Sequence, residues 1–553
     1  MPPDGATARA EAQGTLARVA HQMATAPEIG ELLENLRGFE AEHDRESFEA
    51  SLIRVTRRDY EKQRRVPADL RAEMTRASSF AYQAWLQARE ACDYEIFRPH
   101  LEHLIGLTRD YIACHEPYDD LYDPMLDDHE PGMKTAEVEV VFDQLRDGLV
   151  EMVAGLGEPV DDSCLYGDYD VERQRVFSLE MLGAWGMDDQ AWRLDDTVHP
   201  FAIALTQSDI RLTTRLFPDS IGGVLSCLHE FGHGIYERQV DPRFFRTPLA
   251  SGASSAFHES QSRLWENVVG RNLSTWKFFY PRLQQLFPGP LSGVSLEQFH
   301  RALNKVAPST VRVEADEVTY SLHIILRFEL ERELLGGTIT TADLPEAFAA
   351  KVRDYLGVEP RDVVEGVLQD VHWSGISFGY FPTYALGNVI SIQLWERAVA
   401  ELGDVDAQFE AGEFGPLREW LGEKVHRWGT TFEPPELLER SVGGPLDAEP
   451  YLAYLRGKLE ALDADRAARR YNPPVSWLYI ALLAAAVVLV AGAEWPRLEE
   501  RFGGKSRRDR QRPKRPKRPG KPHLHVVGDA DEADEFAASV ERDLANLPTI
   551  DDR

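Results

Sequence analysis

The chain has 553 residues, of which 43% are hydrophobic and 28% are charged, as is typical of a globular protein with a large core. Its formal net charge of −31 argues against a nucleic-acid partner, because an acidic surface repels phosphates. The four cysteines are scattered without a C-x-x-C pair, which indicates a reducing compartment and argues against a disulfide framework.

The N-terminal residues contain no apolar stretch, so we expect no signal peptide. Apolar residues then recur at intervals of three and four, which predicts long helices. These helices are expected over residues 29–40, 43–64, 68–90 and 135–156, with a loop at 118–133 that is rich in Asp, Pro and Gly. Strand-like alternation is scarce, and its best examples are 174–179 and 202–216. Because helices return over 296–462, we expect residues 1–465 to form one mainly helical domain with a small sheet.

The segment 222–240 has helical spacing and contains an H-E-x-x-H motif at 229–233. Residues four apart lie on the same face of a helix, so His229 and His233 can direct their imidazoles at one cation. Glu230 follows the first histidine, where a general base for the attacking water belongs. The motif alone is a weak signal, because both histidines can also be ordinary helix residues.

A zinc site of the hydrolytic kind needs a third protein ligand and one open position. The best candidate for that ligand is Glu259, which lies on the next predicted helix, 254–272. No third histidine lies nearby in a competing spacing. The helical context and this second carboxylate-bearing helix favour a metal site over two structural histidines.

Further polar clusters follow and precede the motif. An arginine can form a bidentate pair with a carboxylate, so Arg211 or Arg312 is a candidate for holding a peptide C-terminus. A tyrosine hydroxyl or a histidine can stabilise the oxyanion of a tetrahedral intermediate. The alternative interpretation is that the arginines form structural ion pairs and the tyrosines pack in the core.

In chain order the clusters read H-P-F (199–201), D-x-R-x-T (209–213), H-E-x-x-H (229–233), H-E-S-Q (258–261), V-R-x-x-A-D (311–316) and G-Y-x-x-T-Y (379–384). Together they resemble the carboxypeptidase Taq family of zinc metallocarboxypeptidases, over residues 1 to about 465. The family usually has Ile where Val311 stands, and it has no counterpart of the C-terminal extension.

The resemblance implies a mainly helical, gluzincin-type fold with a small sheet beside the active-site helix, and an enzyme that is cytoplasmic and often homodimeric. Such an enzyme releases amino acids from the free C-terminus of peptides with broad specificity. The resemblance further implies that His229, His233 and Glu259 bind Zn²⁺, for which Co²⁺ can substitute, and that Glu230 is the general base. Arg312 would bind the substrate's terminal carboxylate, and Tyr384 or Tyr380 would serve the oxyanion. The residues expected to shape the substrate site are His199, Asp209, Arg211 and Thr213.

The C-terminal extension contains an almost wholly apolar stretch, 475–494, with Trp477 and Trp495 near its ends. About twenty apolar residues span the hydrocarbon core of a bilayer, so we expect a transmembrane helix there, with a buried helix as the alternative. The tail, 495–553, is first basic and then acidic, and we expect it to be disordered; its basic part can lie on anionic lipid. The positive-inside rule places this tail in the cytoplasm, whereas the cysteines and the missing signal peptide favour a cytoplasmic enzyme domain. We therefore expect a cytoplasmic enzyme with a single membrane anchor.

Two other functions are compatible with the motifs. A zinc endo-oligopeptidase would share the same ligands but would also cleave a C-terminally amidated peptide. A membrane-tethered, non-catalytic binding protein would be expected to have lost Glu230 or a ligand, and all of these residues are present.

Overall fold

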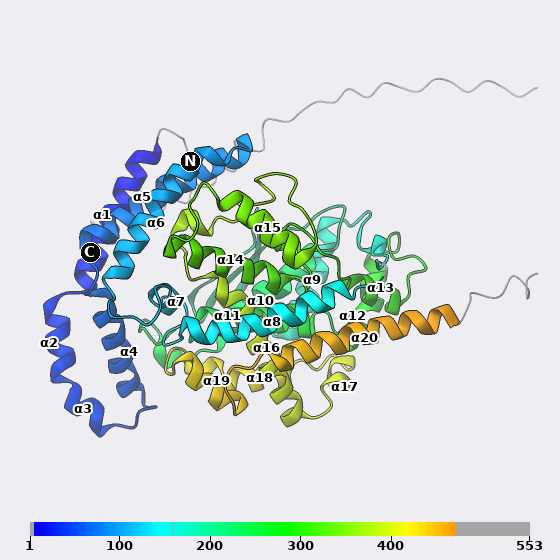
Figure 1. Ribbon diagram of the computed structural model, residues 1–553. Coiled ribbons are helices and arrows are strands. Elements are labelled where there is room, and N and C mark those ends of the chain that lie inside the picture. The colour runs from blue at the N-terminus through cyan, green and yellow to red at the C-terminus, as the bar shows by residue number, and fades with distance from the viewer. Residues whose placement is uncertain (1–4, 158, 472–553) are drawn as a thin grey trace, which may run out of the picture. The chain divides into compact units, whose positions relative to one another are not determined.

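A computed structural model describes residues 5–157 and 159–471 (Figure 1). These residues are mainly helical, as predicted. The N-terminal helices are α1 (Ala6–Ala24), α2 (Pro27–Asn35), α3 (Arg37–Glu42), α4 (Phe48–Gln63), α5 (Ala68–Ala91) and α6 (Arg98–Ala113). They are followed by α7 (Asp123–Asp127), α8 (Thr135–Ala154) and α9 (Val171–Trp185). The predicted helix 29–40 is thus divided into α2 and α3, and α4 starts later than predicted because the Ser47 side chain accepts a hydrogen bond from Ala50 N and caps it.

The predicted strand at 174–179 is wrong, because this segment lies inside α9. The Asp170 side chain caps the helix by accepting a hydrogen bond from Arg173 N. The buried residues of α9 recur at helical spacing, and they are Gln174, Phe177, Ser178, Met181, Leu182 and Trp185. The short alternation in the sequence was therefore part of a longer helical pattern.

A three-stranded sheet consists of β1 (Trp192–Asp196), β2 (Ala202–Thr206) and β3 (Asp209–Thr214), in the order β1-β3-β2. β1 is parallel to β3, with Trp192 opposite Ile210, and β2 is antiparallel to β3, with Ala202 opposite Leu212. The predicted strand 202–216 therefore contains β2 and β3 joined by a tight turn. β1 was missed because most of its side chains are charged and partly exposed.

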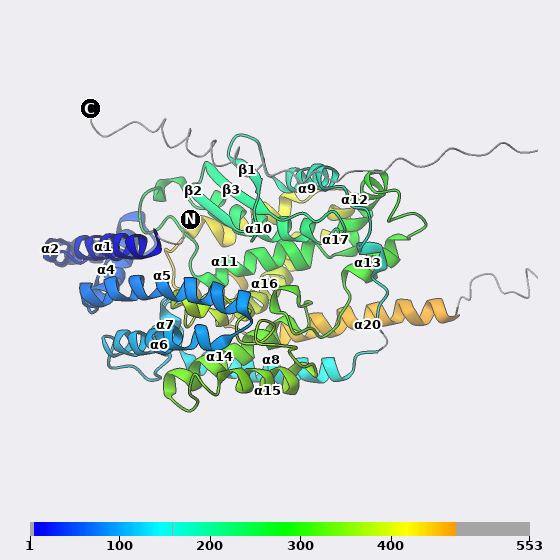
Figure 2. The ribbon, with the colours of Figure 1, turned by 90° about the horizontal axis from the view of Figure 1, so that it is seen from above.

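The active-site region is layered (Figure 2). Helix α10 (Gly223–Gln239) packs against the sheet on one side and against α11 (Ser255–Arg263) on the other, and α11 packs on α16 (Phe381–Leu402). The chain continues from α11 into a π-helical turn, η5 (Leu264–Val269). Phe231 of α10 is fully buried among Trp185, Trp192 and Trp265, with ring centroids 5.3–5.7 Å apart, so the histidine-bearing face of α10 turns the other way.

Two glycines allow this close packing. A Cβ on Gly232 would collide with the backbone of Gln261 and Ser262 in α11. A Cβ on Gly387 of α16 would lie 2.8 Å from the Cβ of Glu259. Helix α11 is therefore held between α10 and α16 at a distance that only glycine permits at these two contacts.

The remaining helices complete the unit around these layers. They are α12 (Leu273–Leu286), α13 (Leu296–Leu303), α14 (Tyr320–Gly336), α15 (Leu344–Leu356), α17 (Val405–Glu410), α18 (Gly415–Lys424), α19 (Pro434–Val442) and α20 (Glu449–Tyr471). Short 3₁₀ helices lie between them and their predecessors, namely η2 (Tyr94–Ile96), η3 (Ser163–Leu165), η4 (Pro242–Phe244), η6 (Arg312–Glu314), η7 (His372–Gly375) and η8 (His426–Trp428).

The predicted fold class is wrong in its membrane part. Within residues 5–157 and 159–471, the structure contains no helix that is both long and apolar enough to cross a bilayer. The stretch 475–494 and the tail 495–553, on which the membrane and disorder predictions fall, lie outside the described residues.

Candidate metal and active site

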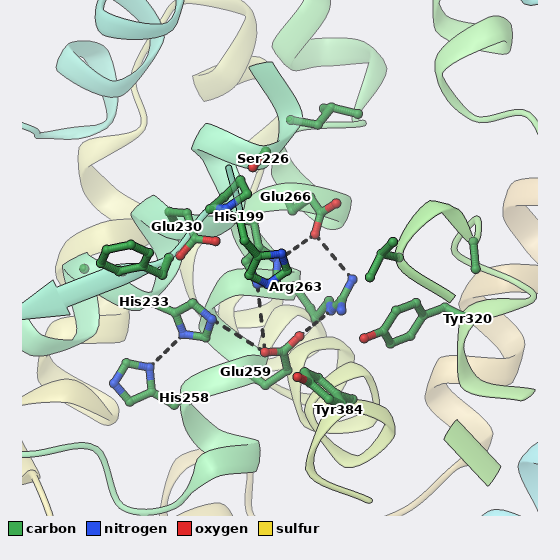
Figure 3. A pocket seen from close by; sticks show the side chains of 18 of the residues that line it. His199, Ser226, Glu230, His233, His258, Glu259, Arg263, Glu266, Tyr320 and Tyr384 are labelled. Atoms are coloured by element: carbon green, nitrogen blue, oxygen red, sulfur yellow. Dashed lines mark hydrogen bonds and ion pairs between the residues drawn. The ribbon is translucent and has the colours of Figure 1, made fainter. Parts of the chain in front are cut away.

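Two imidazoles and one carboxylate converge at the interface of α10 and α11 (Figure 3). Glu259 Oε2 lies 3.5 Å from His233 Nε2 and 4.0 Å from His229 Nε2. The nearest donor atoms of the three residues all lie within 4.8 Å of one another. Both histidines come from α10, four residues apart, and Glu259 is directed at them from α11.

This arrangement fits a divalent ion. Zinc bonds to His nitrogen and carboxylate oxygen are about 2.0–2.2 Å long, so tetrahedral ligand atoms lie roughly 3.3–3.6 Å apart. The distances from Glu259 to the two histidines are within a few tenths of an ångström of this range. Glu259 is nearly fully buried, where a carboxylate needs a cationic partner. Arg263 provides one at Oε1, and Oε2 faces the two histidines.

Each histidine is oriented through its other ring nitrogen. His229 Nδ1 lies 2.8 Å from Glu266 Oε2. Although burial acts to raise the pKa of Glu266, the contacts with His229 and Arg263 lower it to about 2. Arg263 Nε donates to Glu259 Oε1 at 2.6 Å and Arg263 Nη1 to Glu266 Oε2 at 3.4 Å, so it links these two carboxylates.

The His233 ring has a different partner. Its Nδ1 lies 2.8 Å from His258 Nδ1, and His258 Nε2 lies 2.8 Å from Glu237 Oε1. The two candidate ligand histidines therefore have different hydrogen-bond partners at Nδ1, a carboxylate for His229 and a second imidazole for His233.

Glu230 lies beside this cluster and lines the same cavity. Its side chain is 6% exposed, and burial is the main reason that its pKa rises to about 7, although the nearby His229 opposes the shift. A carboxylate with a pKa close to neutrality can both accept and return a proton.

The cluster opens into a cavity of ≈ 1340 Å³. Of the predicted substrate and oxyanion residues, His199, Arg312, Tyr380 and Tyr384 line it. Asp209, Arg211 and Thr213 do not belong to its lining. The structure therefore brings most of the predicted residues together with the metal cluster but leaves the D-x-R-x-T motif outside.

That motif lies on one face of β3. Arg211 Nε and Nη2 each donate to the Asp209 carboxylate at 2.9 Å, and the two side chains are 42% and 39% exposed. The Thr213 hydroxyl accepts a hydrogen bond from Phe201 N at 2.8 Å and donates to Phe201 O at 2.9 Å. Thr213 therefore fixes the backbone of the H-P-F segment, two residues after His199.

Arg312 is buried at the cavity wall. Its Nε donates to Asp370 Oδ1 at 2.9 Å and its Nη1 to the Tyr320 hydroxyl at 3.0 Å. Asp370 Oδ2 accepts from Arg327 Nε at 2.6 Å, and although burial acts in the opposite direction, the two arginines hold the pKa of Asp370 well below its usual range. Two guanidinium groups thus share one carboxylate, which leaves an excess of positive charge beside the cavity.

Both predicted tyrosines project from the first turn of α16 and the residue before it. The Tyr384 ring lies 5.1 Å from the guanidinium carbon of Arg312 and 5.2 Å from the Tyr380 ring. The Tyr384 hydroxyl lies 3.1 Å from His372 Nε2. Burial lowers the pKa of His372 to about 4, so the imidazole is neutral near pH 7.

Sequence reasoning gave no role to several residues that contact this site. Glu237 follows His233 by four residues on the same face of α10, and His258 directly precedes Glu259, so the spacing already contained a signal for both. Arg263 and Glu266 lie within the predicted helix of Glu259, four and seven residues after it. No local sequence pattern identifies Asp370, because it lies 58 residues after Arg312 and contacts it only in the folded protein.

The comparisons with known proteins agree with this geometry. A family profile described as Carboxypeptidase Taq (M32) metallopeptidase matches residues 1–459. Thermostable carboxypeptidase 1 of Thermus thermophilus is 44% identical over 475 residues, which cover 84% of this chain and 93% of that protein. Carboxypeptidase 1 of Bacillus subtilis is 36% identical, over 83% of this chain and 92% of that protein. The crystal structure of an M32 carboxypeptidase from Deinococcus radiodurans superposes with a TM-score of 0.78 at 38% identity, covering 84% of this chain and 93% of that one.

Proposed function

Because the chain belongs to the carboxypeptidase Taq (M32) family of metallopeptidases and is a peptide hydrolase, we propose that it releases amino acids one at a time from the free C-terminus of peptides, with broad specificity. The convergence of His229, His233 and Glu259 next to Glu230 is the observation that supports this proposal most strongly. We further propose that residues 1–465 suffice as the peptidase domain.

We infer that the ion is Zn²⁺, with Co²⁺ as a functional substitute, and that His229, His233 and Glu259 hold it. Two imidazoles and one carboxylate are a ligand set of hydrolytic zinc sites. When bound, such an ion polarises the scissile carbonyl and lowers the pKa of water to about 7.

Glu230 is the proposed general base. Its carboxylate takes a proton from the attacking water and delivers it to the nitrogen of the leaving amino acid. The position of Glu230 supports both steps, because it follows the candidate ligand His229 directly and lines the same cavity. Tyr384 or Tyr380 donates a hydrogen bond from its hydroxyl to the oxyanion, a role that their place on the cavity wall supports.

Arg312 is the proposed site for the terminal carboxylate of the substrate. Its side chain lines the cavity, and Arg312 and Arg327 together carry more positive charge than Asp370 neutralises. A fixed guanidinium on the wall of the same cavity would hold the terminal carboxylate so that the last peptide bond lies at the ion, which converts peptide hydrolysis into trimming from the C-terminus.

The deciding experiment compares a free-ended peptide with its C-terminally amidated twin, using zinc-loaded protein and mass spectrometry of the products. We expect stepwise loss of residues from the free peptide and little cleavage of the twin. Arg312→Lys should raise KM for the free peptide about tenfold, since it removes bidentate geometry, whereas the exposed Arg361→Lys should change nothing. Efficient cleavage of the amidated peptide would instead establish the endo-oligopeptidase, and no cleavage of either by zinc-loaded protein would support the non-catalytic binding protein.

The assembly and the cellular location stay predictions. We expect a homodimer, which sedimentation velocity of the purified chain measures, and a cytoplasmic enzyme domain.

A further inference from the structure

His258, whose imidazole lies next to that of His233, is not itself suited to be a metal ligand. His258 Nδ1 faces His233 and His258 Nε2 faces Glu237, so both of its nitrogens are already engaged. Figure 3 shows His258 on the far side of His233 from Glu259. The His258 ring also packs 5.2 Å from the ring of Tyr236, which holds it in this position.

Proton counting defines the state of each ring. Two ring nitrogens 2.8 Å apart form a hydrogen bond only if one carries a proton and the other does not. His233 presents Nε2 toward Glu259, and a histidine that binds a metal through Nε2 carries its proton on Nδ1. His258 Nδ1 must then be the acceptor. The proton of His258 is therefore on Nε2, where the Glu237 carboxylate accepts it.

We propose that Glu237 and His258 are positioning residues that select the Nδ1-protonated tautomer of His233 and thereby determine how tightly its Nε2 holds the metal ion. This inference depends on the metal site of the proposed function. Glu237 is well placed for the role because it follows His233 by one helical turn on α10, and its side chain is 20% exposed. The relay consists of Glu237, His258 and His233, whereas on the other side Glu266 contacts His229 directly.

The proposal predicts that substitutions of Glu237 and His258 differ according to whether the new side chain can accept a hydrogen bond. In Glu237→Gln a neutral amide replaces the carboxylate. With its oxygen toward His258 the amide is a weaker acceptor for the Nε2 proton, and with its NH₂ group toward His258 it would move that proton to Nδ1 and place two N–H groups face to face. His258→Phe removes the imidazole acceptor and keeps an aromatic ring in its place. His258→Gln keeps both functions, because its carbonyl can accept from His233 and its amide can donate to Glu237.

The test measures zinc affinity of the full chain by competition with a chromophoric chelator, after thermal unfolding of the metal-free proteins has shown that each variant folds. We expect Glu237→Gln and His258→Phe to weaken zinc binding about 10- to 100-fold, as loss of such outer partners does. The double variant should bind no more weakly than His258→Phe, since Glu237 acts only through His258. His258→Gln should recover most of the lost affinity, and the exposed Glu439→Gln should match the wild type.

Three results would overturn the relay. Unchanged zinc affinity in Glu237→Gln and His258→Phe would show that His233 needs no such partner. Additive losses in the double variant would show that Glu237 acts as a distant charge. Failure of His258→Gln to recover affinity over His258→Phe would show that packing rather than hydrogen bonding matters. A wild-type protein that binds no zinc would refute the metal site of the proposed function. A wild-type protein that binds zinc, combined with any of the three results above, would refute the relay alone.

The visible spectrum of the Co²⁺-loaded proteins provides a second readout, and it should change in Glu237→Gln but not in Glu439→Gln.

Discussion

The helix pair α10–α11 and the strand β3 both carry polar motifs that the sequence suggested for the active site, but only the helix pair directs them into the cavity. On α10 and α11 the polar side chains face a second helix at close range and find their partners there. On β3 the alternate residues Asp209 and Arg211 face outward and pair with each other. A motif therefore identifies residues that belong together, while the neighbouring element decides whether they contact substrate or support the scaffold.

The largest effect is expected on the helix-pair side, from Glu230→Gln. The amide cannot accept the proton of the attacking water, so kcat for release of a C-terminal residue should fall about 10²- to 10⁴-fold. Zinc content, measured by mass spectrometry of the metal, should match the wild type because no proposed ligand is changed. A variant that retained more than a tenth of wild-type turnover would remove Glu230 from the mechanism.

The next prediction concerns the contact that brings the two helices together. Gly232→Ala places a Cβ against the backbone of Gln261 and Ser262, which cannot move aside like a flexible side chain. We expect a loss of about 1–3 kcal/mol in unfolding free energy together with weaker zinc binding. The matched control is Gly106→Ala in α6, where a Cβ meets nothing within 4 Å and should stabilise by about 0.5–1 kcal/mol. Equal stability changes in the two variants would contradict the close-packing argument.

A pH-dependent effect arises where α11 begins. Glu130 is fully buried, its Oε1 accepts a hydrogen bond from Ala256 N, and burial raises its pKa from 4.5 to about 8. Between these values the folded protein keeps a proton that the unfolded chain has lost, so stability falls as pH rises from about 4.5 to about 8, by at most roughly 1.4 kcal/mol per pH unit. Glu130→Gln keeps an acceptor oxygen and lacks this titration. In urea unfolding at pH 5, 6, 7 and 8, the unfolding free energy of the variant relative to that of the wild type should therefore increase at each step. Unfolding free energies that change in parallel with pH would rule the effect out.

The smallest effect is expected from the strand. Asp209→Asn and Arg211→Gln break an ion pair whose side chains are about two-fifths exposed, and such pairs contribute roughly 0.2–1 kcal/mol. Stability should change within that range and kcat/KM within about twofold. A tenfold loss of kcat/KM in either variant would show that β3 contributes to the substrate site after all, and the contrast with the helix pair would disappear.

The predictable part of the fold and site was local. Helical spacing identified α10 and the helix of Glu259, because both have long periodic patterns with polar side chains at intervals of four. Pairings across the fold were not predictable. Arg312 and Asp370 are separated by 58 residues, and nothing in either segment specifies the other. β1 has too few apolar residues to be recognised before β3 is placed beside it.

The two glycine contacts also determine what happens when the ion is removed. Helix α11 is held between α10 and α16 by packing rather than by the ion, and the hydrogen bond from Arg263 fixes the Glu259 carboxylate. A chelator-treated protein should consequently preserve the spacing of its donor atoms, so that one divalent metal can be exchanged for another at room temperature without unfolding the chain.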